Sequence, residues 1–277
     1  MPRRLFLFAA YDPFGTVGAS LLWHVSALSR LGKVVLYADG AFSSEELGKL
    51  SGQVLYAGAS AHGEYDFGSY KRAWDWARAS LDLGEFDYVY MVNDSVFGPL
   101  YELGPYLERM EALAVPAFGM VLNPHRRSPH LQSWFIGMGR EVFVSDWFGP
   151  FLDSVEHQEH KEDVCIKYET GLTALLDARG IAYEGLYRLS GKKIYNALGL
   201  QRRLRLPFVK KASFTRHGGS LGAGLKRVLG AAPEACRRAV LEDVSRLYGE
   251  DYAGRLLTSD PFVIAWRYLA YLFRKLF

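Results

Sequence analysis

The stretch "FDYVYMVNDSVFGPLY", residues 86–101, decides the fold class of this 277-residue chain. Its residues 88–92 form an unbroken apolar and aromatic run, as in a strand buried on both faces of a parallel sheet. Asn93, Asp94 and Ser95 follow directly. Ligands bind α/β sheets beyond the carboxyl ends of parallel strands. The stretch therefore predicts a buried parallel strand whose end contributes to a binding site.

The segments around this stretch alternate between strand and helix. Apolar runs of strand length occupy residues 5–10, 34–37 and 54–57, and residues 21–31 and 70–81 have helical spacing. Alternation of this kind predicts a mostly parallel sheet with helices on both faces. Further segments complete the pattern: strands at 117–121 and 134–138, and helices at 163–179 and 233–248. The expected class is α/β, with a Rossmann-type sheet.

Charge and cysteine content exclude several classes of protein. The formal net charge is only +3, without the strong positive charge of a nucleic-acid-binding protein. Cys165 and Cys236 are too few for a disulfide framework, which favours a reducing compartment. The first apolar run ends at Asp12, too early for a signal peptide, and no run reaches the roughly 18 residues that span a bilayer. We therefore expect a cytoplasmic protein that does not bind nucleic acid.

Asp12 and Asp94 each follow a predicted strand. With Asn93 and Ser95 beside it, Asp94 offers oxygen atoms suited to a divalent cation or to a ribose hydroxyl. An aspartate that bonds its own backbone in a turn fits the local sequence equally well.

The stretch "HGEYDFGSYKRAW", residues 62–74, is a second candidate. Gly63 and Gly68 flank a short loop around Asp66, and Ser69 is expected to cap the helix that carries Lys71. A helix N-terminus with nearby cations suits a diphosphate. Neither GxxxxGK[ST] nor GxGxxG occurs here, so an ordinary glycine-rich loop is the alternative.

Two further positions carry suitable side chains. In "HLQSWF", residues 130–135, His130 and Gln132 have the groups that bind sugar hydroxyls, although a lone loop histidine is more often structural. Glu169, beside Tyr168 in a predicted helix, is a candidate general base. The alternative for Glu169 is a surface residue paired with a neighbouring lysine.

Taken in order and spacing, these motifs resemble the rhamnan synthesis F family of polysaccharide glycosyltransferases. The resemblance covers residues 5 to 215. It rests on five stretches: "YDPFG" at 11–15, "GEYDFGSYKRAW" at 63–74, "YVYMVNDSVFGPL" at 88–100, "HLQSWF" at 130–135 and "YETGLT" at 168–173.

The resemblance implies a GT-A-like glycosyltransferase that builds rhamnose-containing cell-surface polysaccharide. The implied reaction transfers L-rhamnose from dTDP-β-L-rhamnose to a hydroxyl of a lipid-linked acceptor, with inversion. Two alternatives remain: a non-catalytic partner of a polysaccharide synthase that binds nucleotide or carbohydrate, and the same chemistry with another nucleotide-sugar donor.

The resemblance also implies roles for particular residues. Asp94 occupies the place of the DxD motif and, with Asn93 and Ser95, binds the donor directly or through Mg²⁺ or Mn²⁺. The other implied roles are diphosphate binding by Ser69 and Lys71, and sugar binding by His130 and Gln132. Asp12 and Asp66 are expected to act as a base, to bind the ribose or to position a loop. The favoured general base is Glu169, with Asp146 in reserve.

The end of the chain has a different pattern. We expect a transferase domain over 1–230 and a helical extension over 231–277, ending in "DPFVIAWRYLAYLFRKLF". Asp260 caps the last helix. One side of that helix is apolar and the other is basic: Phe262, Trp266, Leu269, Leu272, Phe273, Leu276 and Phe277 against Arg267, Arg274 and Lys275. This pattern favours a helix at the inner face of the cell membrane, and packing on its own domain is the alternative.

Overall fold

The structure is a computed structural model that describes residues 2–215 and 222–276. The strands are β1 Arg4–Tyr11, β2 Lys33–Asp39, β3 Tyr56–Ser60, β4 Tyr88–Asn93, β5 Val96–Phe97, β6 Ala117–Asn123, β7 His130–Leu131, β8 Phe135–Gly139, β9 Tyr183–Arg188 and β10 Val209–Lys210. The helices are α1 Ala19–Ser29, α2 Ser44–Gly48, α3 Tyr65–Ser80, η1 Leu83–Glu85, α4 Gly104–Glu111, α5 Arg140–Phe143, α6 Phe148–Asp153, α7 Lys161–Val164, η2 Cys165–Thr170, α8 Gly171–Ala178, α9 Lys193–Asn196, α10 Leu198–Leu204, α11 Ala212–Thr215, α12 Gly222–Leu229, α13 Glu234–Tyr248, α14 Glu250–Leu256 and α15 Pro261–Leu276.

The chain folds into two compact units. Unit 1 comprises residues 1–17, 25–94 and 103–190, and unit 2 comprises residues 18–24, 95–102 and 191–277. The sequence predicted a boundary after residue 230. Unit 2 instead starts its main segment at Gly191, because α12 and α13 contribute to one hydrophobic cluster.

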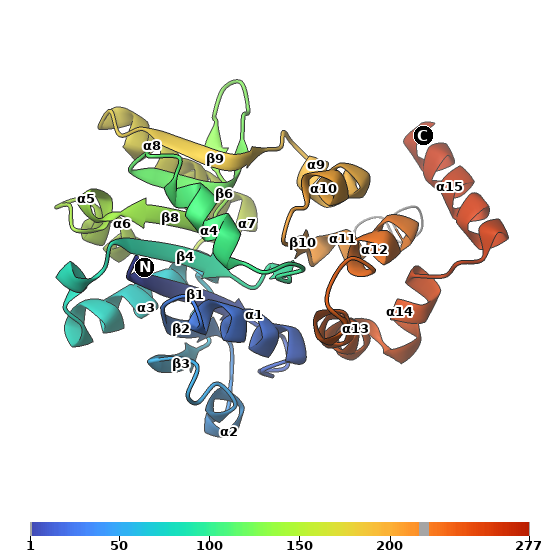
Figure 1. Ribbon diagram of the computed structural model, residues 1–277, viewed down its shortest axis with the longest axis horizontal. Helices are drawn as coiled ribbons and strands as arrows, with labels where there is room; N and C mark the ends of the chain where they lie inside the picture. Colours follow the sequence, from blue (N-terminus) through green and yellow to red (C-terminus); the bar gives the residue numbers. More distant parts are fainter. Residues whose placement is uncertain (1, 216–221, 277) are drawn as a thin grey trace. The chain divides into compact units, whose positions relative to one another are not determined.

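Unit 1 is built on one sheet with the order β3-β2-β1-β4-β8-β6-β7, and β9 pairs with β6 (Figure 1). The pairs β1–β2, β1–β4, β2–β3 and β6–β9 are parallel, whereas β8 runs antiparallel to β4 and to β6. The α/β class with a mostly parallel sheet flanked by helices is therefore confirmed. The strand predicted at residues 88–92 is observed as β4, which extends to Asn93 and lies in the interior of the sheet.

Alternate residues of the central strands face opposite sides of the sheet. Leu5 and Leu7 belong to the core that includes Phe67 and Tyr70 of α3. Phe6 packs on Tyr90, with ring centroids 5.1 Å apart, and the Tyr90 hydroxyl donates to Glu111 of α4 at 2.6 Å. Helices α3 and α4 therefore cover opposite faces, which explains why these strands are apolar throughout.

Helix α3 begins earlier than the sequence suggested. It starts at Tyr65, with Glu64 at the N-cap, whereas the predicted helix began at Tyr70. Ser69 is therefore inside the helix and fully buried, so the prediction that Ser69 caps it was wrong. Strand β3 also lies slightly later than expected, at Tyr56–Ser60.

Unit 2 has a small core of its own. Strands β5 and β10 pair antiparallel, with Phe97 opposite Val209. Around them pack apolar side chains of the helical segments, among them Leu198, Phe214, Leu225, Val240 and Leu256. The buried carboxylate of Asp243 in α13 accepts hydrogen bonds from the backbone N–H and the hydroxyl of Ser20 in α1. These contacts involve only residues assigned to unit 2.

Candidate active site

The carboxyl ends of β1, β2 and β4 bring acidic residues to one edge of the sheet. Tyr11 of β1 is in register with Asp39 of β2, and Ala9 of β1 is in register with Asn93 of β4. Asp94 continues this pairing, since its backbone N–H donates to the Ala9 carbonyl at 3.1 Å. Parallel strands direct their carboxyl ends to the same edge. Asp39 and Asp94 therefore lie at the edge where α/β sheets bind ligands.

Asp66, in the first turn of α3, joins three elements at this edge. Its Oδ2 atom accepts hydrogen bonds from Asn93 Nδ2 at 2.9 Å and from Ser133 Oγ at 3.0 Å. Asn93 ends β4, and Ser133 lies between β7 and β8. A carboxylate that accepts two donors is held in a fixed orientation. The predicted site residues Asp66 and Asn93 are thus in direct contact, together with Ser133.

Glu169 is attached to the same cluster. Its Oε1 atom accepts a hydrogen bond from the backbone N–H of Ser133 at 2.9 Å. Glu169 lies on η2, a π-helical segment over Cys165–Thr170, and such segments frequently occur at functional sites. The predicted base therefore lies next to Asp66, because both carboxylates bond Ser133.

The hydroxyl of Tyr70 lies among these carboxylates. It donates to the carbonyl of Ser133 at 2.9 Å, and the side chain is fully buried. Burial raises the pKa of Tyr70 well above 10, and the charges of Asp66, Glu169 and Asp94 raise it further. Tyr70 therefore remains a neutral donor that fixes the Ser133 backbone. We call Asp66, Asp94 and Glu169 the carboxylate cluster.

The loop after β1 is held rigidly beside this edge. Asp12 Oδ1 accepts from the backbone N–H groups of Phe14 at 2.9 Å and Thr16 at 3.2 Å. Gly15 has φ +63°, and a Cβ there would lie 2.2 Å from the Ala41 carbonyl oxygen. The turn thus presents two largely exposed rings, Tyr11 at 58% and Phe14 at 66% exposure. Asp12 behaves as a loop-positioning residue, one of the roles expected for it.

Asp39 and His62 form a second polar group that the sequence did not indicate. Asp39 Oδ1 accepts from the backbone N–H groups of His62 at 3.0 Å and Gly63 at 3.1 Å. His62 Nδ1 accepts from the Glu64 N–H at 3.1 Å, which leaves Nε2 to donate to Ser69 Oγ at 3.0 Å. Burial lowers the pKa of His62, although Asp39 raises it. His62 therefore acts as a neutral bridge between the end of β2 and α3.

Two unusual backbone positions set the start of α3. Gly63 has φ +67°, and Tyr65 has φ +59°, which is strained for a residue with a bulky side chain. Strained positions of this kind cluster at functional sites. A Cβ on Gly68 would lie 2.4 Å from Glu64 Cβ and 2.7 Å from His62 Nδ1. The glycines of "HGEYDFGS" thus allow the tight entry into α3 that orients Asp66.

Lys71 does not face the carboxylate cluster. It follows Asp66 by five positions, which at 100° per residue turns it about 140° away around the helix. Its ammonium group donates to the carbonyls of Asp153 and Val155, both at 2.9 Å. Lys71 therefore connects α3 to the end of α6 through these two hydrogen bonds.

Three other predicted site residues, Gln132, His130 and Ser95, form hydrogen bonds with groups outside the carboxylate cluster. Gln132 Oε1 accepts from the indole of Trp134 at 2.8 Å, and His130 bonds Asn123 and the Ser128 carbonyl. Ser95 belongs to unit 2, where its hydroxyl accepts from Lys210 at 3.0 Å. None of these contacts includes a carboxylate of the cluster.

Asp146 lies at the opposite edge of the sheet. Strand β8 starts at Phe135, opposite Val92, and ends at Gly139, opposite Tyr88 at the amino end of β4. Asp146 follows this end, in the exposed connection between α5 and α6. The five residues of β8 alone span about 15 Å. The structure thus does not bring Asp146 together with Glu169.

The cluster offers few ligands for a metal ion. Across residues 2–215 and 222–276, no group of three His, Cys, Asp or Glu side chains is placed to hold one. Mg²⁺ often binds through one or two carboxylates and the phosphates of a substrate. The half-buried Asp94 fits that mode of binding, in which most of the ligands come from the donor.

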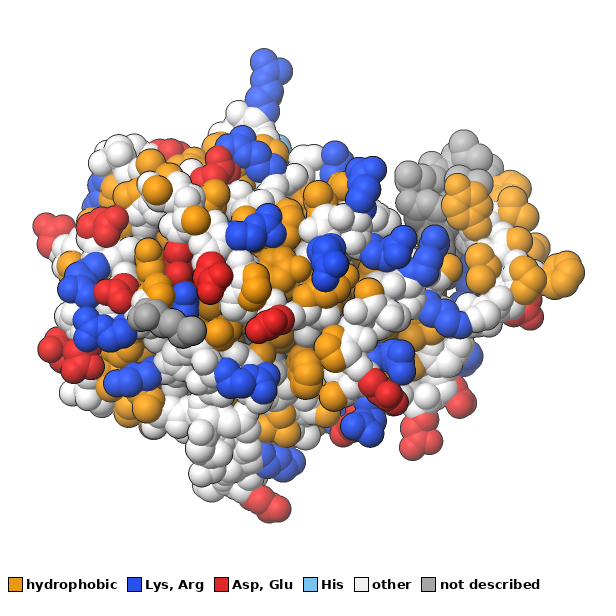
Figure 2. Space-filling view, viewed as in Figure 1, with side chains coloured by type: hydrophobic (Ala, Val, Ile, Leu, Met, Phe, Trp, Pro, Cys, Tyr) orange, Lys and Arg blue, Asp and Glu red, His pale blue; other side chains and the backbone are white. Residues whose placement is uncertain are grey.

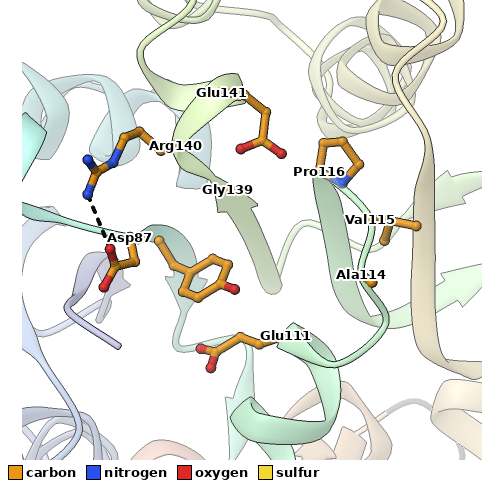
Figure 3. Close-up of a pocket in the computed structure, with 9 residues that line it drawn as sticks. Asp87, Glu111, Ala114, Val115, Pro116, Gly139, Arg140 and Glu141 are labelled. Carbon is orange, nitrogen blue, oxygen red and sulfur yellow. Dashed lines mark hydrogen bonds and ion pairs between the residues drawn. The ribbon is translucent and has the colours of Figure 1, made fainter. Parts of the chain in front are cut away.

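A separate hollow of about 340 Å³ also lies in unit 1, at the edge away from the cluster (Figure 3). Asp87, Glu111, Arg140 and Glu141 are among its lining residues, and Arg140 pairs with Asp87 at 3.2 Å. Asp87 precedes β4, whereas Asp94 follows it. The length of β4 therefore separates this hollow from the cluster, and it contains none of the predicted site residues.

A family model described as rhamnan synthesis protein F matches residues 37–258. No curated protein sequence matches the chain.

The solved structures that match the chain have low sequence identity and TM-scores below 0.5. A candidate nucleotide-diphospho-sugar transferase from Desulfovibrio desulfuricans G20 is 15% identical, with 86% of this chain and 99% of that chain covered, at a TM-score of 0.44. A 4-diphosphocytidyl-2C-methyl-D-erythritol synthase from Anaerococcus prevotii is 11% identical over 67% and 87%, at 0.39. A glycosyltransferase involved in glycosylation of the major capsid of PBCV-1 is 8% identical over 76% and 93%, at 0.39.

Proposed function

The chain belongs to the rhamnan synthesis protein F family, and from this premise we propose that it is a GT-A-like glycosyltransferase of polysaccharide synthesis. The donor we propose is dTDP-β-L-rhamnose, and the acceptor is a hydroxyl of a lipid-linked glycan. The observation that carries the proposal is the carboxylate cluster, in which Asp66 and Glu169 both bond Ser133 at the carboxyl edge of the sheet.

In this reaction Glu169 is the general base. It removes the proton from the acceptor hydroxyl while that oxygen attacks the anomeric carbon of the donor. The bond from this carbon to the phosphate oxygen breaks, and dTDP leaves with the bonding electrons. Attack from the side opposite the leaving group inverts the configuration. The bond from the Ser133 N–H to Oε1 orients Glu169 for this step.

Asp94 is proposed to bind the donor at the end of β4. Asp94 would hold a divalent cation, and the positive charge of that ion would stabilise the departing diphosphate. Asp66 holds Asn93 and Ser133 in place and thus acts as a positioning residue. The exposed rings of Tyr11 and Phe14 are suited to stacking on the nucleobase or on a sugar face.

A donor-turnover assay tests the proposal. Purified protein is incubated with dTDP-β-L-rhamnose, Mg²⁺ and a lipid-linked glycan fraction, and released dTDP and product are measured. We expect release of dTDP that depends on acceptor, with UDP-sugars as poorer donors. Glu169→Gln should reduce turnover by about 10²-fold or more while dTDP binding is retained. The matched control is Glu162→Gln, which changes an exposed glutamate of α7.

Two results would contradict the proposal. If dTDP binds but no donor is turned over with any acceptor fraction, the chain is a nucleotide-binding partner rather than a transferase. If UDP-sugars are turned over and dTDP-rhamnose is not, the transferase assignment stands and the donor assignment is wrong.

A further inference from the structure

Helix α15 has its most apolar face directed outward. Four large side chains of this helix are strongly exposed: Phe262 at 83%, Trp266 at 73%, Leu269 at 50% and Phe273 at 62%. At 100° per residue these four positions fall within about 60° of one another around the helix axis. We call them the apolar stripe. Figure 2 shows hydrophobic side chains gathered on the surface that α15 forms.

The opposite side of α15 faces the protein. Val263, Ile264, Arg267 and Ala270 are only half-exposed, and they cluster on the side away from the stripe. The guanidinium of Arg267 donates to the carbonyl of Arg255 at 2.7 Å, at the end of α14. Arg267 thus connects α15 to α14 within unit 2. The alternative that α15 buries its apolar face against its own domain does not hold for the residues described.

The start of α15 is fixed locally. Asp260 Oδ1 accepts from the backbone N–H groups of Phe262 at 2.9 Å and Val263 at 3.3 Å, so Asp260 caps the helix as predicted. The side chains of Leu272, Arg274, Lys275 and Leu276, and all of Phe277, lie outside the described residues. The described part of the stripe extends from Phe262 to Phe273, or about 16 Å along the axis.

The charge of this part of the chain identifies the kind of surface that the stripe fits. Residues 191–277 contain 17 Lys and Arg against 6 Asp and Glu, a formal charge of +11, whereas residues 1–190 carry a formal charge of −8. A basic region beside an aromatic stripe matches a surface that is both anionic and apolar. A second copy of the same strongly basic segment would be repelled. The bases of a nucleic acid offer no continuous apolar layer to receive the stripe.

We infer that α15 lies on the surface of an anionic phospholipid bilayer, with the apolar stripe inserted among the lipids. Of the helices that the structure describes, none has the length and apolar character needed to cross a bilayer, so the expected contact is in the interface plane. The family match ends at residue 258, before α15 starts, so the helix is outside the region shared with the family model. The inference does not depend on the proposed glycosyl transfer.

Vesicle binding tests the inference. The full chain is sedimented with vesicles of phosphatidylglycerol and phosphatidylcholine, and with phosphatidylcholine alone. We expect binding to the anionic vesicles that salt weakens. Exchange of three stripe residues in one variant, Phe262→Ser, Trp266→Ser and Phe273→Ser, should weaken that binding at least about tenfold. Since all three are exposed, folding should be retained.

A matched control separates the stripe from general loss of aromatic surface. Tyr268→Ser removes another exposed ring of α15, about 120° from the stripe, and should leave vesicle binding unchanged. Equal binding of the triple variant and the unaltered protein would overturn the inference. So would a lipid-free dimer, detected by sedimentation velocity, that the triple variant abolishes, because the stripe would then bind a second copy. Affinity for dTDP, measured on the same variants, should stay constant and distinguishes failure here from failure of the proposed function.

Discussion

Asp66 and Asn93 join the first turn of α3 to the end of β4 through a hydrogen bond of 2.9 Å from the amide to the carboxylate. The two residues are separated by 27 positions and come from two motifs that look independent in the sequence. Since Ser133 donates to the same carboxylate oxygen, three segments depend on a single side chain.

Asp66→Asn should impair turnover more than it impairs stability. The substitution removes the charge that holds two donors, and small misplacement of reacting groups costs about 10²-fold in rate. We expect a loss of that order, with a decrease of about 1–2 kcal/mol in the free energy of unfolding. The control is Asp75→Asn, a half-buried carboxylate of the same helix that pairs with Arg78 of α3 and does not contact Asn93 or Ser133. Unchanged turnover in Asp66→Asn would remove this contact from the active site.

Gly68→Ala should destabilise unit 1, because the new Cβ would lie 2.4 Å from Glu64 Cβ. We expect a loss of about 1–3 kcal/mol in the free energy of unfolding, measured by urea denaturation. Gly48→Ala is the matched control, since no atom lies within 4 Å of the position that its Cβ would take. Equal unfolding curves for both variants would show that the entry into α3 tolerates a side chain.

Lys71→Met should reduce stability and leave dTDP affinity unchanged. Its ammonium group bonds two backbone carbonyls, and hydrogen bonds to charged groups contribute about 1.5–3 kcal/mol. Lys71 is partly exposed, so the expected loss is at the lower end of this range. Urea unfolding and nucleotide titration measure the two quantities. A tenfold weaker affinity with unchanged unfolding would instead support the diphosphate role that the family resemblance implied.

Protonation of His24 should destabilise the protein at acidic pH. This residue of unit 2 is fully buried against Phe208, with ring centroids 4.8 Å apart, and burial lowers its pKa to about 3, with a smaller contribution from the charge of Lys211. The unfolded chain has the ordinary pKa near 6.5 and therefore binds more protons between pH 6.5 and 3. The free energy of unfolding therefore has its full value, as far as His24 is concerned, above pH 6.5. As the pH falls through this window, it decreases by up to about 1.4 kcal/mol for each pH unit.

Comparison with His24→Phe isolates this contribution from that of the carboxylates. The difference in unfolding free energy between the two proteins should shift steadily in favour of His24→Phe between pH 6.5 and pH 4. A difference that is constant with pH would mean that His24 is already charged or becomes exposed in the folded state.

The main strands and the end of β4 were predictable because their signals are local. Residues 88–92 are apolar without interruption, and Asp94 follows directly. The start of α3 was not predictable in the same way. Gly63 and Gly68 look like loop residues, but Gly68 is needed inside the helix because Glu64 and His62 approach it closely.

The partners within the site depend on contacts that are distant in sequence. In "HLQSWF" the residue bonded to Asp66 is Ser133 rather than the neighbouring Gln132, and the choice depends on which way the segment faces the sheet. Asp39 and His62 lie 23 positions apart and meet only because β2 and β3 are adjacent. No local pattern marks Asp39, and the motif at residues 62–74 does not by itself indicate a role for His62.

The most direct test of the account is calorimetric titration of dTDP, with and without Mg²⁺, into three proteins: the unaltered chain, Asp94→Ala and Glu141→Ala. Asp94 lies at the carboxyl edge of the sheet, and Glu141 lines the hollow near the opposite edge. If the carboxylate cluster binds the donor nucleotide, Asp94→Ala should weaken dTDP binding at least about tenfold. The Glu141→Ala variant should bind dTDP with the same affinity as the unaltered chain. Undiminished binding in Asp94→Ala, with loss in Glu141→Ala, would contradict the account and place the nucleotide in the hollow.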